Sequence, residues 1–181
     1  MKLFTIVTEE DPRIHQKCTP VALPLSEETR NTILDMVQYL KLSQDDAFAK
    51  KNNIRPGVGI AAPQIGIFER FYAVSFDDEG KHYEYGLVNP EIVSTSVKKG
   101  YIAGGEGCLS VPVDVPGHVY RYYKVTIKAF DALTMKDVVI RLHGYPAMVF
   151  QHEYDHLDGI LYYDRIDPKD PFREDPDAVE L

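Results

Sequence analysis

The chain has 181 residues, a hydrophobic content of 44% and a formal net charge of −8, which together suit one packed, acidic domain. The acidic balance argues against binding to nucleic acid or to anionic membranes, because both depend on clustered Lys and Arg. Two cysteines are too few for a disulfide framework, and no run of about 18 apolar residues is present to span a membrane. We therefore predict a single domain over residues 1–181 of a soluble, cytoplasmic protein.

The first strong pattern, at residues 26–42, predicts an amphipathic helix. Ser26 is suited to the N-cap, Glu27 and Glu28 to the first turn, and apolar side chains follow at helical spacing. Residues 43–56 are polar and lose this period. We interpret them as a long loop or a frayed extension of the helix.

The middle of the chain has the pattern of antiparallel sheet. Aromatic and β-branched residues alternate there with polar ones, and Gly, Pro or Asp separates the runs. The runs lie at residues 67–76, 82–89, 91–97, 119–130 and 137–142.

A second helix is predicted at residues 147–157, with Pro146 in the first turn and Gly159 at the C-terminal stop. Three prolines among many charges follow Asp164. They deny residues 165–181 a continuous helix and predict an extended or loose acidic tail.

The second helix carries the segment HEYDH, in which His152 and His156 lie four positions apart around Glu153. Four residues turn through about 400°, so both imidazoles face one side and can bind the same metal ion. Glu153 is displaced by about 100° from His152, so its carboxylate can reach a water on the ion without binding the ion itself. This spacing is typical of a metal-activated hydrolase. The alternative is an amphipathic helix whose histidines make ordinary hydrogen bonds.

A catalytic ion of this kind requires a third protein ligand. Tyr162 stands where metzincin proteases place a third His, which disfavours that class. Glu174 would complete a thermolysin-like site, but it lies in the Pro-rich tail. Cys108, in the glycine-rich segment GGEGCLSVP, is the remaining soft ligand. Alone it would be interpreted as a small buried side chain, whereas beside the histidine pair the ligand role is favoured.

The segment GVGIAAPQ, residues 57–64, contains only small or apolar residues before Gln64. A peptide main chain could lie against it as an added strand. A phosphate-binding loop is disfavoured, because no Lys, Ser or Thr follows the glycines at the required spacing.

Three segments, taken in order, resemble the peptide deformylase family: GVGIAAPQ at 57–64, EGCLS at 106–110 and QHEYDH at 151–156. The resemblance extends from about Asp11 to Asp164. The inserted polar segment and the lack of a helical tail are closer to the longer deformylases common in Gram-positive bacteria. The implied fold is α+β, with antiparallel sheets packed around a central metal-binding helix and a further helix near the N-terminus.

The activity that the resemblance implies is hydrolysis of the N-formyl group from the formyl-methionine end of newly made polypeptides, with release of formate. The implied cofactor is one divalent ion, Fe(II) physiologically, with Zn, Ni or Co in a purified sample. The ribosome is a candidate partner. The alternatives are another HExxH metallo-amidohydrolase or peptidase, and a binding protein that has lost its ion.

The resemblance also implies roles for individual residues. The implied metal ligands are Cys108, His152 and His156, and the implied catalytic groups are Glu153 as acid/base with Gln64 and the Leu109 N–H as an oxyanion pocket. Candidates for the substrate-binding wall are Val58 and Gly59 from the first segment, and Met148 and Val149, which lie on the His152 face of the helix by helical spacing.

Overall fold

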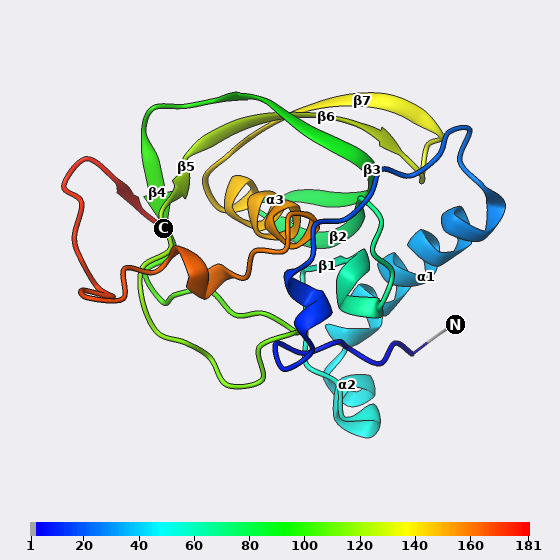
Figure 1. Ribbon diagram of the computed structural model, residues 1–181, viewed down its shortest axis with the longest axis horizontal. Helices are drawn as coiled ribbons and strands as arrows, with labels where there is room; N and C mark the ends of the chain where they lie inside the picture. Colours follow the sequence, from blue (N-terminus) through cyan, green and yellow to red (C-terminus); the bar gives the residue numbers. More distant parts are fainter. Residues whose placement is uncertain (1–2) are drawn as a thin grey trace.

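A five-stranded antiparallel sheet forms the centre of the computed structural model, which describes residues 3–181 (Figure 1). Its strands in spatial order are β1 (Gly59–Ala61), β2 (Phe71–Asp78), β3 (Lys81–Thr95), β6 (Lys124–Asp131) and β7 (Lys136–His143). The prediction of antiparallel sheet is therefore confirmed. The runs predicted at 82–89 and 91–97 form one long strand, because β3 absorbs the break between them as a shift of register against β6.

A second, smaller sheet lies beside the first and contains β5 (Arg121–Tyr122), β4 (Lys99–Tyr101) and β8 (Val179–Glu180). β4 pairs antiparallel with β5 and parallel with β8. The end of the acidic tail is thus held against the body of the protein. The hydroxyl of Tyr101 also donates to the Glu180 carboxylate at 2.7 Å.

The helix α3 (Gly144–Leu157) lies across one face of the five-stranded sheet, near the middle of the molecule (Figure 1). Most of its side chains are buried, and Phe150 packs against Tyr72 and Phe76 of β2. The backbone turns left-handed at Gly159, with φ +73°, just beyond the helix end, as the C-terminal stop was predicted to do. A buried helix with fixed ends holds its side chains in one orientation.

The helix α1 (Glu27–Ser43) covers the opposite face of the sheet. Its predicted N-cap forms, since the Ser26 hydroxyl accepts from the Thr29 N–H at 3.1 Å. Ile33, Met36 and Leu40 are fully buried on its inner side. The prediction of an N-terminal helix is confirmed.

The segment 43–56 contains a short helix, α2 (Asp46–Asn52), that the sequence pattern did not reveal. Seven residues are too few for a helical period to emerge. The signals lie at the ends: the Asp45 carboxylate accepts from the Phe48 N–H at 2.7 Å, and Asn53 turns left-handed with φ +52°.

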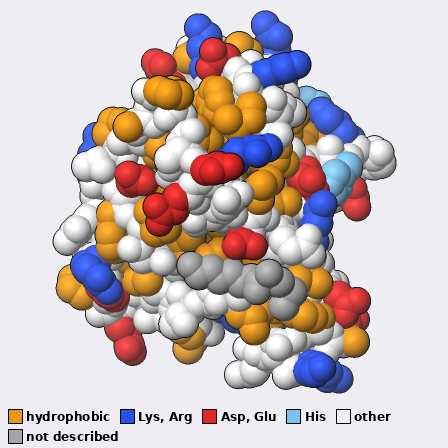
Figure 2. Space-filling view, turned by 90° about the vertical axis from the view of Figure 1, so that its right-hand side faces the viewer, with side chains coloured by type: hydrophobic (Ala, Val, Ile, Leu, Met, Phe, Trp, Pro, Cys, Tyr) orange, Lys and Arg blue, Asp and Glu red, His pale blue; other side chains and the backbone are white. Residues whose placement is uncertain are grey.

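On the face formed by α1 and the N-terminal segment, acidic and basic side chains are interspersed with hydrophobic ones (Figure 2). No helix within residues 3–181 is long and apolar enough to cross a bilayer.

Candidate metal centre and its cavity

The structure brings Cys108, His152 and His156 together, although the cysteine is far from the histidines in sequence. One possible ligand atom from each residue lies within 4.8 Å of the others. The Cys108 Sγ and the His156 Nε2 are 3.3 Å apart, and all three side chains are almost fully enclosed. Among the described residues this is the one group of three or more His, Cys, Asp or Glu whose atoms converge in this way.

The sulfur is carried by a tight turn, Cys108–Val111, closed by a hydrogen bond from the Val111 N–H to the Cys108 carbonyl at 3.1 Å. Gln64 lies beside this turn, and its Nε2 is 3.2 Å from the Ser110 Oγ and 3.5 Å from the Cys108 Sγ. The other end of the Gln64 amide accepts from the Ala61 N–H at 2.8 Å. The Gln64 NH₂ group is therefore fixed beside the sulfur.

His152 is oriented by Glu106, whose carboxylate lies 2.7 Å from the imidazole Nδ1. This contact leaves Nε2 as the nitrogen that can face an ion. The guanidinium of Arg121 donates to both oxygens of Glu106, at 2.6 and 2.9 Å. Burial by itself would raise the pKa of Glu106, but the Arg121 charge and its hydrogen bonds outweigh burial and lower that pKa to about 2.

The charge cluster continues on the far side of Arg121. This guanidinium also donates to Asp155 at 2.7 Å, and Arg165 donates to both oxygens of the same carboxylate at 2.5 Å. Asp155 is therefore buried and paired. Glu106 and Arg121 were missed as supporting residues; the available signal was a basic residue at an inward position of an alternating β-strand pattern.

Glu153 lies on the cavity side of α3 and is 4% exposed. Its Oε2 has no hydrogen-bond partner within residues 3–181, and burial raises its pKa to about 7. Gly59 of β1 faces this carboxyl group so closely that an added Cβ would lie 2.6 Å from the Glu153 Cδ. The absence of a side chain at position 59 is what makes room for Glu153.

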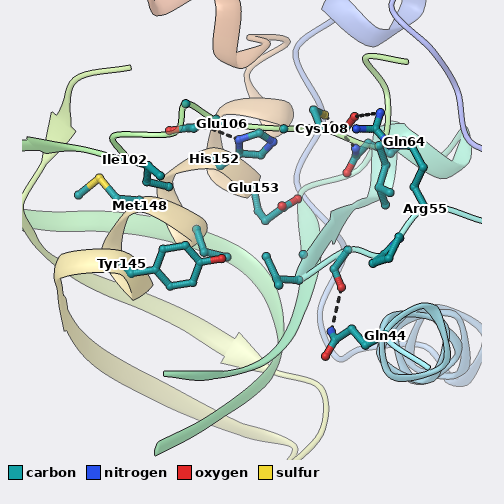
Figure 3. A pocket seen from close by; sticks show the side chains of 18 residues that line it. Gln44, Arg55, Gln64, Ile102, Glu106, Cys108, Tyr145, Met148, His152 and Glu153 are labelled. Atoms are coloured by element: carbon teal, nitrogen blue, oxygen red, sulfur yellow. Dashed lines mark hydrogen bonds and ion pairs between the residues drawn. The ribbon is translucent and has the colours of Figure 1, made fainter. Parts of the chain in front are cut away.

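A cavity of about 370 Å³ opens beside these groups (Figure 3). In the close-up view Glu153 points into this space from α3, with Met148 and Tyr145 farther along the same helix. All four residues expected to form the substrate-binding wall do line the cavity: Val58, Gly59, Met148 and Val149. Leu109 and Gln64 line it as well.

The donor set fits a divalent transition-metal ion. One thiolate and two imidazoles are the ligands that Zn, Fe(II) or Ni accept, and three protein ligands leave a fourth position open. Glu174, the other residue considered as a third ligand, is not part of this group. Tyr162 stacks on the His152 ring, and its hydroxyl accepts from the Val115 N–H at 2.7 Å, while Glu174 is exposed in the tail.

Comparison with known proteins gives a consistent result. Residues 3–172 match the family model described as polypeptide deformylase. Peptide deformylase 2 of Geobacillus stearothermophilus is 48% identical over 177 residues, covering 97% of this chain and 96% of that protein. Peptide deformylase of Oceanobacillus iheyensis is 49% identical over 168 residues, covering 92% and 91%.

Solved structures with the same fold include the peptide deformylase of Thermotoga maritima. It is 31% identical, with a TM-score of 0.74, over 93% of this chain and 100% of that one. The actinonin-bound class I type b peptide deformylase of Acinetobacter baumannii is 30% identical, with a TM-score of 0.71, over 92% and 100%.

Proposed function

The chain belongs to the peptide deformylase family, and we propose that Cys108, His152 and His156 form the metal centre at which it removes the N-formyl group from newly made polypeptides. The resemblance drawn from the three sequence segments is confirmed, including its Gram-positive character, since the relatives come from Bacillus-type organisms. The observation that carries the proposed site is the convergence of one sulfur and two imidazoles beside a buried glutamate, whose Oε2 has no hydrogen-bond partner within residues 3–181.

The family is metal-dependent, and the donor atoms present here suit one divalent ion. When bound, the ion polarises the formyl oxygen and lowers the pKa of water. We propose Fe(II) as the physiological ion, with Zn, Ni or Co able to replace it in a purified sample. The thiolate of Cys108 would make the Fe(II) form sensitive to air, because the ion and the sulfur can both be oxidised.

Glu153 is the proposed general base and general acid. It accepts a proton from the attacking water and delivers it to the amine nitrogen that leaves as the new N-terminus. A pKa near 7 suits both steps, because the carboxyl group can then gain and lose a proton at neutral pH.

Gln64 and the Leu109 N–H are the proposed donors to the oxygen on which negative charge develops. The contact from the Ala61 N–H fixes the Gln64 amide before substrate arrives, so no reorganisation is needed in the transition state. Removing one such donor typically costs about 3 kcal/mol, so Gln64→Leu should lower turnover by two to three orders of magnitude.

The substrate is proposed to bind along β1, which is an edge strand of the sheet and lines the cavity. Peptide hydrogen bonds to the strand would hold the main chain, while Val58, Met148 and Val149 offer apolar surface to the methionine side chain. We place this reaction in the cytoplasm, where nascent chains emerge, with the ribosome as a candidate partner.

A different HExxH amidohydrolase or peptidase would accept an acyl group larger than formyl. Formyl-Met-Ala and acetyl-Met-Ala separate the two activities, and we expect product from the formyl peptide alone. Stoichiometric metal in anaerobically purified protein would argue against a binding protein that has lost its ion.

The decisive experiment measures metal content and formate release for the wild type and Glu153→Ala. We expect the variant to retain its metal and to lose activity by about three orders of magnitude, because the ligands remain and the proton carrier does not. Undiminished formate release would refute the role assigned to Glu153.

A further inference from the structure

We propose that Arg55 is a positioning residue of this site, which holds the turn Cys108–Val111 so that the Leu109 N–H points into the cavity. The inference deepens the proposed function and rests on it. Arg55 lies in the loop between α2 and β1, outside the three segments that carry the family resemblance.

The guanidinium of Arg55 donates hydrogen bonds to both ends of the turn. Its Nη1 donates to the Val111 carbonyl at 2.8 Å and to the Cys108 carbonyl at 3.3 Å. Its Nη2 donates to the exposed carboxylate of Asp114 at 3.0 Å. One side chain thus connects the loop before β1 to the segment that carries the sulfur.

The hydrogen bond from Arg55 to the Cys108 carbonyl also affects the Leu109 N–H, which belongs to the same peptide group. The Cys108 carbonyl and the Leu109 N–H belong to one peptide plane, which is trans, so they point in opposite directions. A donor that holds the carbonyl on one side therefore sets the direction of the N–H on the other. Rotation of this plane takes place about ψ of Cys108 and φ of Leu109, the two backbone dihedrals that flank it.

The backbone on either side of Arg55 is held by hydrogen bonds. The Ser43 hydroxyl accepts from the Gly57 N–H at 3.1 Å, and the Gln44 amide donates to the Gly57 carbonyl at 2.9 Å, a contact visible in Figure 3. On the other side, the Ile54 N–H donates to the Ala49 carbonyl at the end of α2. The end of α1 and the end of α2 together hold the short loop that presents the guanidinium.

Within the described residues, the other hydrogen bonds to this turn, apart from contacts of the Cys108 sulfur, are made at Ser110. The Glu9 N–H donates to the Ser110 carbonyl at 2.8 Å, and Gln64 contacts the Ser110 hydroxyl. These contacts hold the second half of the turn, whereas the Cys108 carbonyl is held by Arg55 and by the bond that closes the turn. Loss of Arg55 should therefore loosen the peptide that carries the Leu109 N–H.

The kinetic signature follows from the role of that N–H in the transition state. Arg55→Met should lower kcat by about 10- to 100-fold, less than complete loss of an oxyanion donor, and change KM by less than about threefold. Arg55→Lys should recover much of the loss, because an ammonium group can still donate to the carbonyls without the planar fork. Asp114→Asn is the matched control, since it alters a partner of the same guanidinium but leaves the turn contacts intact.

The test measures kcat and KM on formyl-Met-Ala at equal metal content for the wild type and these three variants. Hydrogen–deuterium exchange of the peptide covering residues 105–111 is followed in parallel, with and without metal. We expect faster exchange in this peptide for Arg55→Met, little change elsewhere, and wild-type behaviour for Asp114→Asn.

Three results would overturn the role of Arg55. They are unchanged exchange in residues 105–111, a change in KM with constant kcat, and an Asp114→Asn variant as impaired as Arg55→Met. If Arg55→Met does not fold, Arg55→Lys alone must show an intermediate exchange rate and kcat. A wild type that releases no formate would refute the proposed function instead, while the exchange measurement would still decide whether Arg55 holds the turn.

Discussion

The two sides of α3 treat buried charge in opposite ways. Arg121 pairs with Asp155, on one side of α3, and with Glu106 through hydrogen bonds of 2.6 to 2.9 Å. The Glu153 Oε2, on the opposite side of this helix, has no hydrogen-bond partner within the described residues, and neither has the His156 Nδ1. Leaving such a buried atom unpaired costs about 1 to 3 kcal/mol.

The contrast is clearest between two residues of the same type. Glu106 and Glu153 are both buried, yet the pKa of the first is lowered to about 2 and that of the second is raised to about 7. Burial raises both values, and the hydrogen bonds that Glu106 makes with Arg121 and His152, which Glu153 lacks, account for the difference. A paired carboxylate serves as a fixed support, and an unpaired one is available for proton transfer at neutral pH.

The largest effect should come from breaking the paired side. Arg121→Met would leave the buried carboxylates of Glu106 and Asp155 without the cation that they share. We expect the free energy of unfolding to fall by about 3 to 5 kcal/mol, measured by urea denaturation. A loss below about 1 kcal/mol would mean that the cluster is not a support.

Replacing Glu153 should raise the free energy of unfolding, whereas replacing Arg121 lowers it, and the effect should depend on pH. The Glu153 pKa in the folded protein, about 7, exceeds the ordinary 4.5, so the folded state holds this proton more tightly than the unfolded chain does. The carboxyl group therefore destabilises the fold progressively as pH rises from 4.5 to 7, by up to about 3 kcal/mol above that range.

Glu153→Gln removes this titration. The metal-free variant should be more stable than the metal-free wild type at pH 8, and the two should converge near pH 4. Urea denaturation at both pH values provides the measurement. A variant that is less stable than the wild type at pH 8 would contradict the contrast between the two glutamates.

Glu106→Gln should weaken metal binding, and it should lower the free energy of unfolding by less than Arg121→Met does. The amide keeps the shape of the carboxylate but orients His152 less strongly, and changes of this kind typically cost 10- to 100-fold in affinity, or about 1.4 to 2.7 kcal/mol. Competition with a chelator measures the affinity. Glu153→Gln is the control and should bind metal as tightly as the wild type does.

The smallest effect is expected at the rim of the paired cluster. Arg165 is 39% exposed, and Asp155 keeps Arg121 as a partner when Arg165 is replaced. Arg165→Met should lower the free energy of unfolding by about 1 kcal/mol or less in urea denaturation. A decrease in the free energy of unfolding as large as that for Arg121→Met would show that both guanidinium groups stabilise the cluster equally.

The helix with the histidine pair could be predicted from sequence because its geometry is local. Helical spacing alone places His152 and His156 on one face and Glu153 at its edge. Cys108 was inferred as the third ligand because it was the remaining soft donor, and the family resemblance implied the same role. No short segment encodes that its loop packs against the helix.

Contacts between distant segments escaped prediction for the same reason. Arg121 lies on β5 and Asp155 on α3, and nothing in either local pattern indicates that they meet. The hydrogen bonds from Arg55 to the turn Cys108–Val111 likewise depend on how α2 and the loop between α2 and β1 are placed. The sequence therefore revealed the reacting groups better than the side chains that hold them.

The close approach of Gly59 to Glu153 couples two sequence segments that are far apart along the chain. An added Cβ at position 59 would lie 2.6 Å from the Glu153 Cδ, so a larger residue there would displace the carboxyl group. A substitution at this position of β1 would thus disturb the proposed proton carrier on α3.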